Sequence, residues 1–161
     1  MSDQFAEFLA TWEKEQKTRR ELGKKCLEKN KAVLLPILKS AGISVVEVEY
    51  DGAGDSGQIN DVSAYRVQGE IPNQKSLRYA LPKEAVTIEL PSRDGGVREF
   101  TDTVEEVIRE LCWELLEMNH PGWENNDGGC GTFTFHVGDE LKIELSHVDY
   151  IVHEEHTVYE W

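Results

Sequence analysis

Two polar, glycine-rich segments contain the residue types of this sequence that are most able to do chemistry. The first, residues 51–59, holds two carboxylates, a hydroxyl and an amide: Asp51, Asp55, Ser56 and Gln58. The second, residues 120–131, holds an indole, two carboxylates and two amides: Trp123, Glu124, Asn125, Asn126 and Asp127. Such side chains on a glycine-rich backbone could grip a polar ligand, because anchored loops often carry function. The structural alternative is a corner in which Asn and Asp side chains bond local backbone groups and Trp123 anchors the turn.

A metal site is a further interpretation of these carboxylates. An EF-hand is excluded, because the third, sixth and twelfth positions counted from Asp51 are Ala53, Ser56 and Val62. A looser arrangement stays open, and it would make the protein a small metal-dependent hydrolase. That site would use four carboxylates: Asp51, Asp55, Glu124 and Asp127.

Nucleophilic catalysis is poorly supported. Residues 54–57 read Gly-Asp-Ser-Gly, as in serine proteases, but all five histidines lie at or after His120 and nothing suggests two β-barrels. Cys130 lies between glycines, yet its sequence neighbours offer no cation that would lower the pKa of its thiol. We therefore expect Cys130 to be a small residue that packs in a tight turn.

Three histidines gather near the C-terminus among acidic residues: His147, His153 and His156. The run from His153 to His156 is not H-E-x-x-H, because its histidines are three positions apart and no helix is expected there. On an extended strand, positions i and i+3 point to opposite faces. We therefore expect surface histidines among acids rather than metal ligands.

The charge of the chain is unevenly distributed. Residues 1–100 carry 15 basic and 16 acidic side chains, whereas residues 101–161 carry two basic and 15 acidic ones, which gives −1 and −13 of the total −14. A surface this negative repels phosphates, so direct nucleic-acid binding is not expected. The charge serves either solubility or a protein partner with a basic surface, including a protein that normally holds nucleic acid. Glu154 and Glu155 are candidate contact residues in this acidic third.

Composition bounds the class of protein. A chain of 161 residues with 39% hydrophobic and 30% charged residues is typical of one globular domain. No apolar run approaches the roughly 20 residues that span a bilayer and no signal peptide opens the chain, so no membrane association is expected. Three widely spaced cysteines without a C-x-x-C pair indicate free thiols and a cytoplasmic location: Cys26, Cys112 and Cys130.

The N-terminal region predicts a helix or helix pair over about residues 3–40. Phe5, Phe8, Leu9 and Trp12 begin an apolar stripe, which Leu22, Cys26, Val33 and Ile37 resume. Pro36 is expected to kink the helix or to begin a second one, and Gly42 to cap its end. Residues 14–31 carry a net charge of +5, which indicates a solvated face or docking against the acidic third, within one chain or in a homodimer.

The rest of the sequence predicts several strands and one more helix. Residues 43–50 predict a strand, and the glycines that follow in residues 51–59 argue against regular structure there. Residues 62–67 could form a short strand, 86–90 and 97–100 a hairpin, and 101–118 a central helix with Leu111 and Leu115 buried. Residues 132–137 and 141–145 predict a second hairpin, and 157–161 a last strand.

Two motifs resemble an uncharacterised family of small proteins found in bacterial genomes and mobile elements. They are Tyr50-Asp51-Gly52-x-Gly54-Asp55-Ser56-Gly57-Gln58-Ile59 and Gly122-Trp123-Glu124-Asn125-Asn126-Asp127-Gly128-Gly129-x-Gly131-x-Phe133-x-Phe135. The resemblance covers roughly residues 33–150. It supports a role for the two loops but implies no particular reaction.

The sequence therefore predicts a single α+β domain over residues 1–161. Its mostly antiparallel sheet should be covered on one face by the N-terminal and central helices. The leading functional hypothesis is a non-enzymatic acidic protein that binds a protein partner, as an inhibitor or nucleic-acid mimic, and needs no cofactor. The alternatives are the metal-dependent hydrolase and a protein that binds a small polar ligand between two neighbouring glycine-rich loops.

Overall fold

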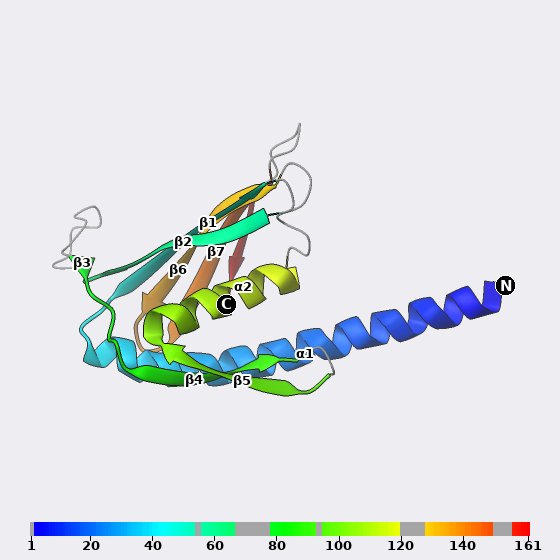
Figure 1. The fold of residues 1–161 in the computed structure, drawn as a ribbon, viewed down its shortest axis with the longest axis horizontal. Helices are drawn as coiled ribbons and strands as arrows, with labels where there is room; N and C mark the ends of the chain where they lie inside the picture. The colour runs from blue at the N-terminus through cyan, green and yellow to red at the C-terminus, as the bar shows by residue number, and fades with distance from the viewer. Residues whose placement is uncertain (1, 54–55, 67–77, 93–94, 120–127, 150–155) are drawn as a thin grey trace.

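A computed structural model of the chain shows a six-stranded sheet, two helices and a separate hairpin (Figure 1). It describes residues 2–53, 56–66, 78–92, 95–119, 128–149 and 156–161. Several sequence-based predictions concern residues outside these ranges and are identified as such below.

The large sheet is antiparallel throughout and has the strand order β3-β2-β1-β6-β7-β8. Its strands are β1 (Val45–Ala53), β2 (Ser56–Tyr65), β3 (Arg78–Tyr79), β6 (Gly129–Val137), β7 (Leu141–Asp149) and β8 (His156–Glu160). Strands β4 (Ala85–Pro91) and β5 (Val97–Thr103) form the separate hairpin. The mostly antiparallel α+β fold and the two hairpins predicted from alternation are confirmed.

Helix α1 (Ser2–Ser40) is one continuous helix that passes through Pro36 rather than a helix pair. Leu34 and Leu38, on either side of the proline, are fully buried and hold this turn against the core. The helix ends as predicted at Gly42, whose φ is 74°. The Gly42 N–H donates to the Lys39 carbonyl at 3.0 Å and the Ile43 N–H to the Leu38 carbonyl at 3.1 Å, the two bonds of a Schellman cap.

Helix α2 (Val104–Asn119) lies between the large sheet and the β4–β5 hairpin (Figure 1). The Glu106 N–H donates to the Thr103 hydroxyl at 3.4 Å, which caps its N-terminus. Leu111 and Leu115 are each 2% exposed, so the predicted apolar face of this helix is confirmed. None of the helices that the structure describes is long and apolar enough to span a bilayer.

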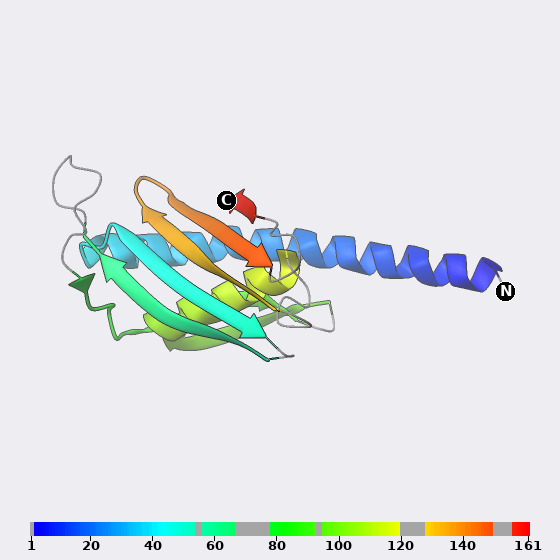
Figure 2. The ribbon, with the colours of Figure 1, turned by 90° about the horizontal axis from the view of Figure 1, so that it is seen from above.

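Both helices cover the same face of the large sheet, as predicted. That face presents the buried side chains of alternate positions, among them Val46, Val48, Phe133, Phe135 and Ile143. Figure 2 shows the sheet from the opposite side, with the helices behind it. No described helix or strand covers this second side, which we call the open face; it presents the intervening positions of β1, β2, β6, β7 and β8.

Two local predictions are wrong. Residues 51–59 are not irregular throughout, because β1 continues to Ala53 and β2 begins at Ser56; antiparallel pairing satisfies their backbone groups despite the glycines. In α1, Val33 is 38% exposed, whereas Asn30 and Leu34 are buried. The core-facing stripe therefore includes Leu34 instead of Val33, because the buried side of α1 is the side that contacts β4.

Candidate binding surface

The open face of the large sheet is strongly acidic. Along β1 the side chains of Glu47, Glu49 and Asp51 alternate with the buried Val48 and Tyr50. The face also receives Glu144 from β7 and Glu160 from β8, by the same alternation on strands paired in antiparallel register. Five carboxylates thus share a surface to which β1, β6, β7 and β8 contribute a single lysine, Lys142.

Strand register places three of these carboxylates in one row across the sheet. Glu47 on β1 pairs with Thr134 on β6, Thr134 with Glu144 on β7, and Glu144 with Glu160 on β8. Directly opposed like charges on a sheet are unfavourable by a few tenths of a kcal/mol or more. Glu144 and Glu160 are the directly opposed pair of this row, so their placement does not stabilise the fold.

Asp51 lies at the end of this surface and is held by two amides from β2. Asn60 Nδ2 donates to Asp51 Oδ1 at 2.9 Å, and Gln58 Nε2 donates to the same oxygen at 3.3 Å. The structure therefore brings together Asp51 and Gln58, two of the candidate residues. Ser56 begins β2 and pairs through its backbone with Ala53.

A bulge in β2 explains how these amides reach Asp51. The pairing of β1 and β2 shifts register between Val48 and Tyr50. Arg109 of α2 then donates from Nη1 to the Ile59 and Asn60 carbonyls, each at 2.8 Å. This side chain supports the bulge from the covered side and fixes Asn60 next to Asp51.

The first glycine-rich motif begins on β1 and ends on β2, and the second ends on the neighbouring strand β6. Gly52 of β1 pairs with Gly57 of β2 on one side and with Gly129 of β6 on the other, and Gly129 pairs with Asp149 of β7. The other candidate residues lie outside the described residues: Asp55, Trp123, Glu124, Asn125, Asn126, Asp127, Glu154 and Glu155. That these side chains form one shared site stays a prediction.

A buried tyrosine–histidine pair lies next to the glycines, and the sequence analysis missed it. Tyr50 and His147 are 2% and 1% exposed, and the Tyr50 hydroxyl lies 2.5 Å from His147 Nδ1. The expectation of a surface histidine is wrong for His147, because its position on β7 points into the core. His153 lies outside the described residues and His156 begins β8.

Gly131 makes this pair possible. Register places Gly131 between Tyr50 and His147, so the tyrosine ring crosses β6 above the glycine. A Cβ at Gly131 would collide with the Tyr50 hydroxyl and the Ser146 carbonyl oxygen. The sequence signal was present, because Gly131 shares the inward alternation of Phe133 and Phe135.

Metal chemistry finds no support in the described part of the chain, where no group of three or more His, Cys, Asp or Glu side chains could hold an ion. Three of the four carboxylates proposed for a hydrolase lie outside that part. Cys26 and Cys112 are buried free thiols, and Cys130 is a half-buried free thiol whose cross-strand neighbour is Asp51.

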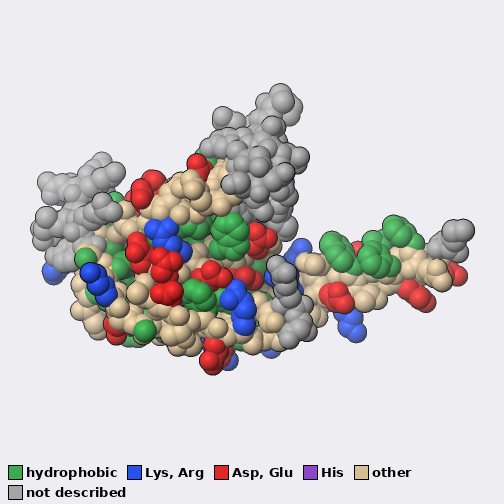
Figure 3. Space-filling view, in the orientation of Figure 1, with side chains coloured by type: hydrophobic (Ala, Val, Ile, Leu, Met, Phe, Trp, Pro, Cys, Tyr) green, Lys and Arg blue, Asp and Glu red, His purple; other side chains and the backbone are tan. Residues whose placement is uncertain are grey.

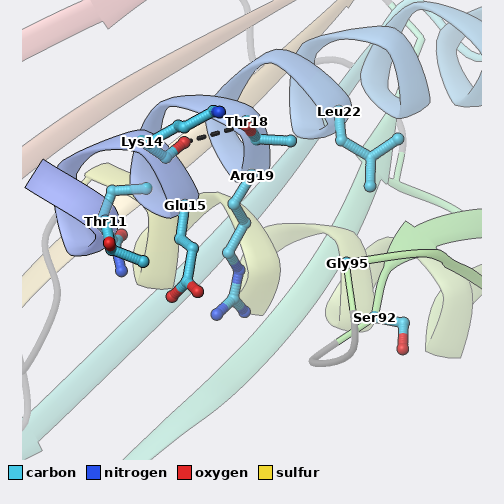
Figure 4. A pocket seen from close by; sticks show the side chains of 9 residues that line it. Thr11, Lys14, Glu15, Thr18, Arg19, Leu22, Ser92 and Gly95 are labelled. Carbon is cyan, nitrogen blue, oxygen red and sulfur yellow. Dashed lines mark hydrogen bonds between the residues drawn. The ribbon is translucent and has the colours of Figure 1, made fainter.

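One carboxyl group among the described residues is buried, where α2 faces α1. Glu114 of α2 is 8% exposed, and burial raises the pKa of its carboxyl, an effect that Arg19 and Arg98 oppose. Arg19 Nη2 lies 3.8 Å from Glu114 Oε1, which has no hydrogen-bond partner among the described residues. Arg19 also lines a hollow of about 460 Å³ between α1 and the β4–β5 turn (Figure 4). Its described lining mixes Lys14, Glu15 and Arg19 with threonines and Leu22, with no arrangement typical of catalysis.

Comparison with known proteins identifies a family that matches most of the chain. A family described as a family of unknown function (DUF6878) matches residues 26–161. The match includes every strand of both sheets and α2, and it leaves out the first 25 residues, most of which form the N-terminal part of α1. No curated protein and no solved structure shows significant similarity to the chain.

Proposed function

The chain belongs to this family of unknown function, DUF6878, and we propose that it binds a basic surface of a protein partner through the open face of its sheet, without catalysis. The observation that carries the proposal is the row Glu47–Glu144–Glu160 together with Glu49 and Asp51. A sheet face opposite a packed core is rigid, so its charges are fixed in position before a partner arrives.

The side chains between the carboxylates favour close approach. Thr134 lies between Glu47 and Glu144 across the sheet, and Thr132 and Ser146 extend the neighbouring row that begins at Glu49. Short hydroxyl side chains leave the face flat and can exchange hydrogen bonds with a partner. Long basic side chains of the partner could then reach the carboxylates, for which Arg is best suited because its guanidinium binds carboxylates bidentately.

A more specific form of the proposal concerns what the partner normally binds. Alternate residues of a strand are about 6.8 Å apart, so Glu47, Glu49 and Asp51 form a line of regularly spaced negative charges. Such a line suits a surface that otherwise holds a nucleic-acid backbone. The protein would then act as an inhibitor that mimics nucleic acid, and the motif resemblance suggests a bacterial or mobile-element setting in the cytoplasm.

Charge reversal on the open face tests the proposal. The variant Glu47→Lys/Glu144→Lys/Glu160→Lys is compared with a control that changes the net charge equally elsewhere. The control, Glu21→Lys/Glu84→Lys/Glu99→Lys, alters exposed acids of α1, of the chain just before β4, and of β5. A partner captured from the natural host with the wild-type protein is identified by mass spectrometry, and its association and dissociation rates are measured with all three proteins.

We expect the open-face variant to associate with the partner at least about tenfold more slowly than wild type. The control should associate at a rate close to that of wild type. Raising salt should slow association of the wild type, because exposed charges are screened beyond about 8 Å at physiological ionic strength. Equal losses in both variants would indicate a general charge effect and would contradict a site on the open face. An association rate independent of salt would contradict the proposal as well.

A second candidate function is favoured by the pairing of Gly52 with Gly129. It brings the flanks of the two glycine-rich motifs together, where a small polar ligand could bind between their loops. In that case Asp55→Ala or Asn126→Ala would abolish binding, salt would matter little, and the open-face variant would bind normally.

A further inference from the structure

The N-terminal part of α1 extends beyond the rest of the molecule and carries uncovered apolar side chains (Figures 1 and 3). Phe5, Phe8, Leu9 and Trp12 are 64%, 63%, 40% and 51% exposed. We call these four residues the tip stripe. They lie outside the part of the chain that matches the family, so the family domain does not account for them.

The tip stripe lies on the same face of α1 that is buried farther along the helix. Eighteen residues make about five full turns of an α-helix. Adding eighteen to the four positions of the tip stripe gives Gly23, Cys26, Leu27 and Asn30, and all four of these are buried. The tip stripe and the buried C-terminal stripe therefore lie on one face of the helix, on either side of the polar residues 13–20, and only the C-terminal stripe has a cover within one chain.

We propose that a second copy of this chain covers the tip stripe, with the two α1 helices packed antiparallel about a two-fold axis. The spacing of the stripe favours this occupant, because positions 5, 8, 9 and 12 are symmetric about the point between Phe8 and Leu9. A two-fold axis through that point places Phe5 of one copy opposite Trp12 of the other. Phe8 and Leu9 of both copies then lie beside the axis, so each stripe buries the other.

Charge on the neighbouring positions agrees with the antiparallel direction. In this arrangement the first turn of one helix, at Ser2 and Gln4, lies beside Glu13 and Glu15 of the second copy. The N-terminus of a helix carries a partial positive charge, which these carboxylates complement. A parallel pair would instead place the two positive helix N-termini side by side. Glu13 of one copy would then lie beside Glu13 of the other.

The available area sets the strength of the dimer. A fully buried aromatic side chain contributes about 150–250 Å², and the tip-stripe residues are roughly half exposed, so the two stripes together offer about 800–1,000 Å². Stable interfaces bury about 1,200–2,000 Å², and smaller ones are weak or transient. The dimer should therefore dissociate at low protein concentration, with a dissociation constant in the micromolar range.

Sedimentation velocity of the full chain over a wide range of concentration tests the proposal. The variant Phe8→Ser/Trp12→Ser removes half of the stripe, and Ala6→Ser/Ala10→Ser is the control on the other side of the same helix. We expect wild type and control to shift from monomer to dimer as concentration rises, and the stripe variant to need at least tenfold more protein. Circular dichroism checks that all three keep the same helix content.

Cysteine cross-linking tests the direction of packing. Gln4→Cys mixed with Glu13→Cys should form a disulfide-linked pair, whereas Gln4→Cys alone should not. Self-linking of Gln4→Cys would indicate a parallel pair and contradict the arrangement. A wild-type chain that stays monomeric at the highest concentration, or a stripe variant that dimerises like the control, would overturn the proposal. The open-face experiment is independent of these outcomes, because it concerns the other side of the molecule.

Discussion

The two faces of the large sheet are made by the same strands and have opposite chemistry. On the covered face, alternate residues of β1, β6 and β7 pack against α1 and α2 and are almost completely buried. On the open face, the intervening residues include five carboxylates and several short hydroxyl side chains. The covered face determines the stability of the fold, and the open face is free to be selected for binding. Substitutions on the two faces should therefore differ sharply in how much they lower the free energy of unfolding.

The largest effect is expected where α2 covers the sheet. Leu111→Ala should lower the free energy of unfolding by about 2–5 kcal/mol, because it truncates a side chain that is 2% exposed. Lys142→Ala on the open face is the matched control and should stay within about 0.5 kcal/mol of wild type. Urea denaturation measures both. An unchanged midpoint for Leu111→Ala would mean that α2 is not an essential cover.

Gly131→Ala should be the next most costly change, at about 1–3 kcal/mol or somewhat more. The added methyl group would collide with the Tyr50 hydroxyl and with backbone at Ser146, and backbone cannot move aside cheaply. The control is Gly138→Ala, where the nearest atom to a new Cβ is the Glu140 carbonyl oxygen at 3.8 Å. Thermal unfolding of the two variants should separate them clearly; equal midpoints would refute the packing role of Gly131.

Tyr50→Phe should cost about 1–3 kcal/mol, because it removes the hydroxyl that bonds a buried imidazole. The ring itself remains and keeps its contact with Phe133, whose centroid lies 5.6 Å away. A double-mutant cycle with His147→Phe isolates the polar interaction. The double variant should cost less than the sum of the single variants, and strict additivity would show that the two groups do not interact.

Glu114→Gln should stabilise the protein by about 1 kcal/mol at neutral pH, since it removes a poorly satisfied buried charge. Burial raises the pKa of this carboxyl in the folded chain above its ordinary value of 4.5. Between the unfolded and the folded pKa of Glu114, the folded chain binds more protons than the unfolded chain. This group's contribution to stability therefore falls as pH rises through that window. The advantage of the variant should vanish below the ordinary pKa. Denaturation of both proteins across the acidic range checks the sign.

The smallest effect is expected on the open face. Glu144→Gln should change the free energy of unfolding by less than about 0.5 kcal/mol, with a slight gain because it relieves repulsion from Glu160. The same substitution should slow association with a basic partner. A large loss of stability would place Glu144 among the structural residues and weaken the contrast between the faces.

Periodicity alone predicted most of the elements and the inward face of α2. Alternation identified the hairpin of β6 and β7, and steps of three and four identified Leu111 and Leu115. The glycines of residues 51–59 misled the prediction, because their local preference for turns yields where neighbouring strands satisfy the backbone. The burial of His147 was missed because its partner Tyr50 is distant in sequence.

Composition and local periodicity are enough to predict the fold class, the acidic charge and the apolar stripe of α1. Which acids share a surface depends on the tertiary structure, since Glu47, Glu144 and Glu160 meet through strand pairing. The same holds for the two parts of the α1 stripe. Both parts lie on one face of the helix, on either side of the polar residues 13–20, and their burial differs because the rest of the chain reaches only the second part.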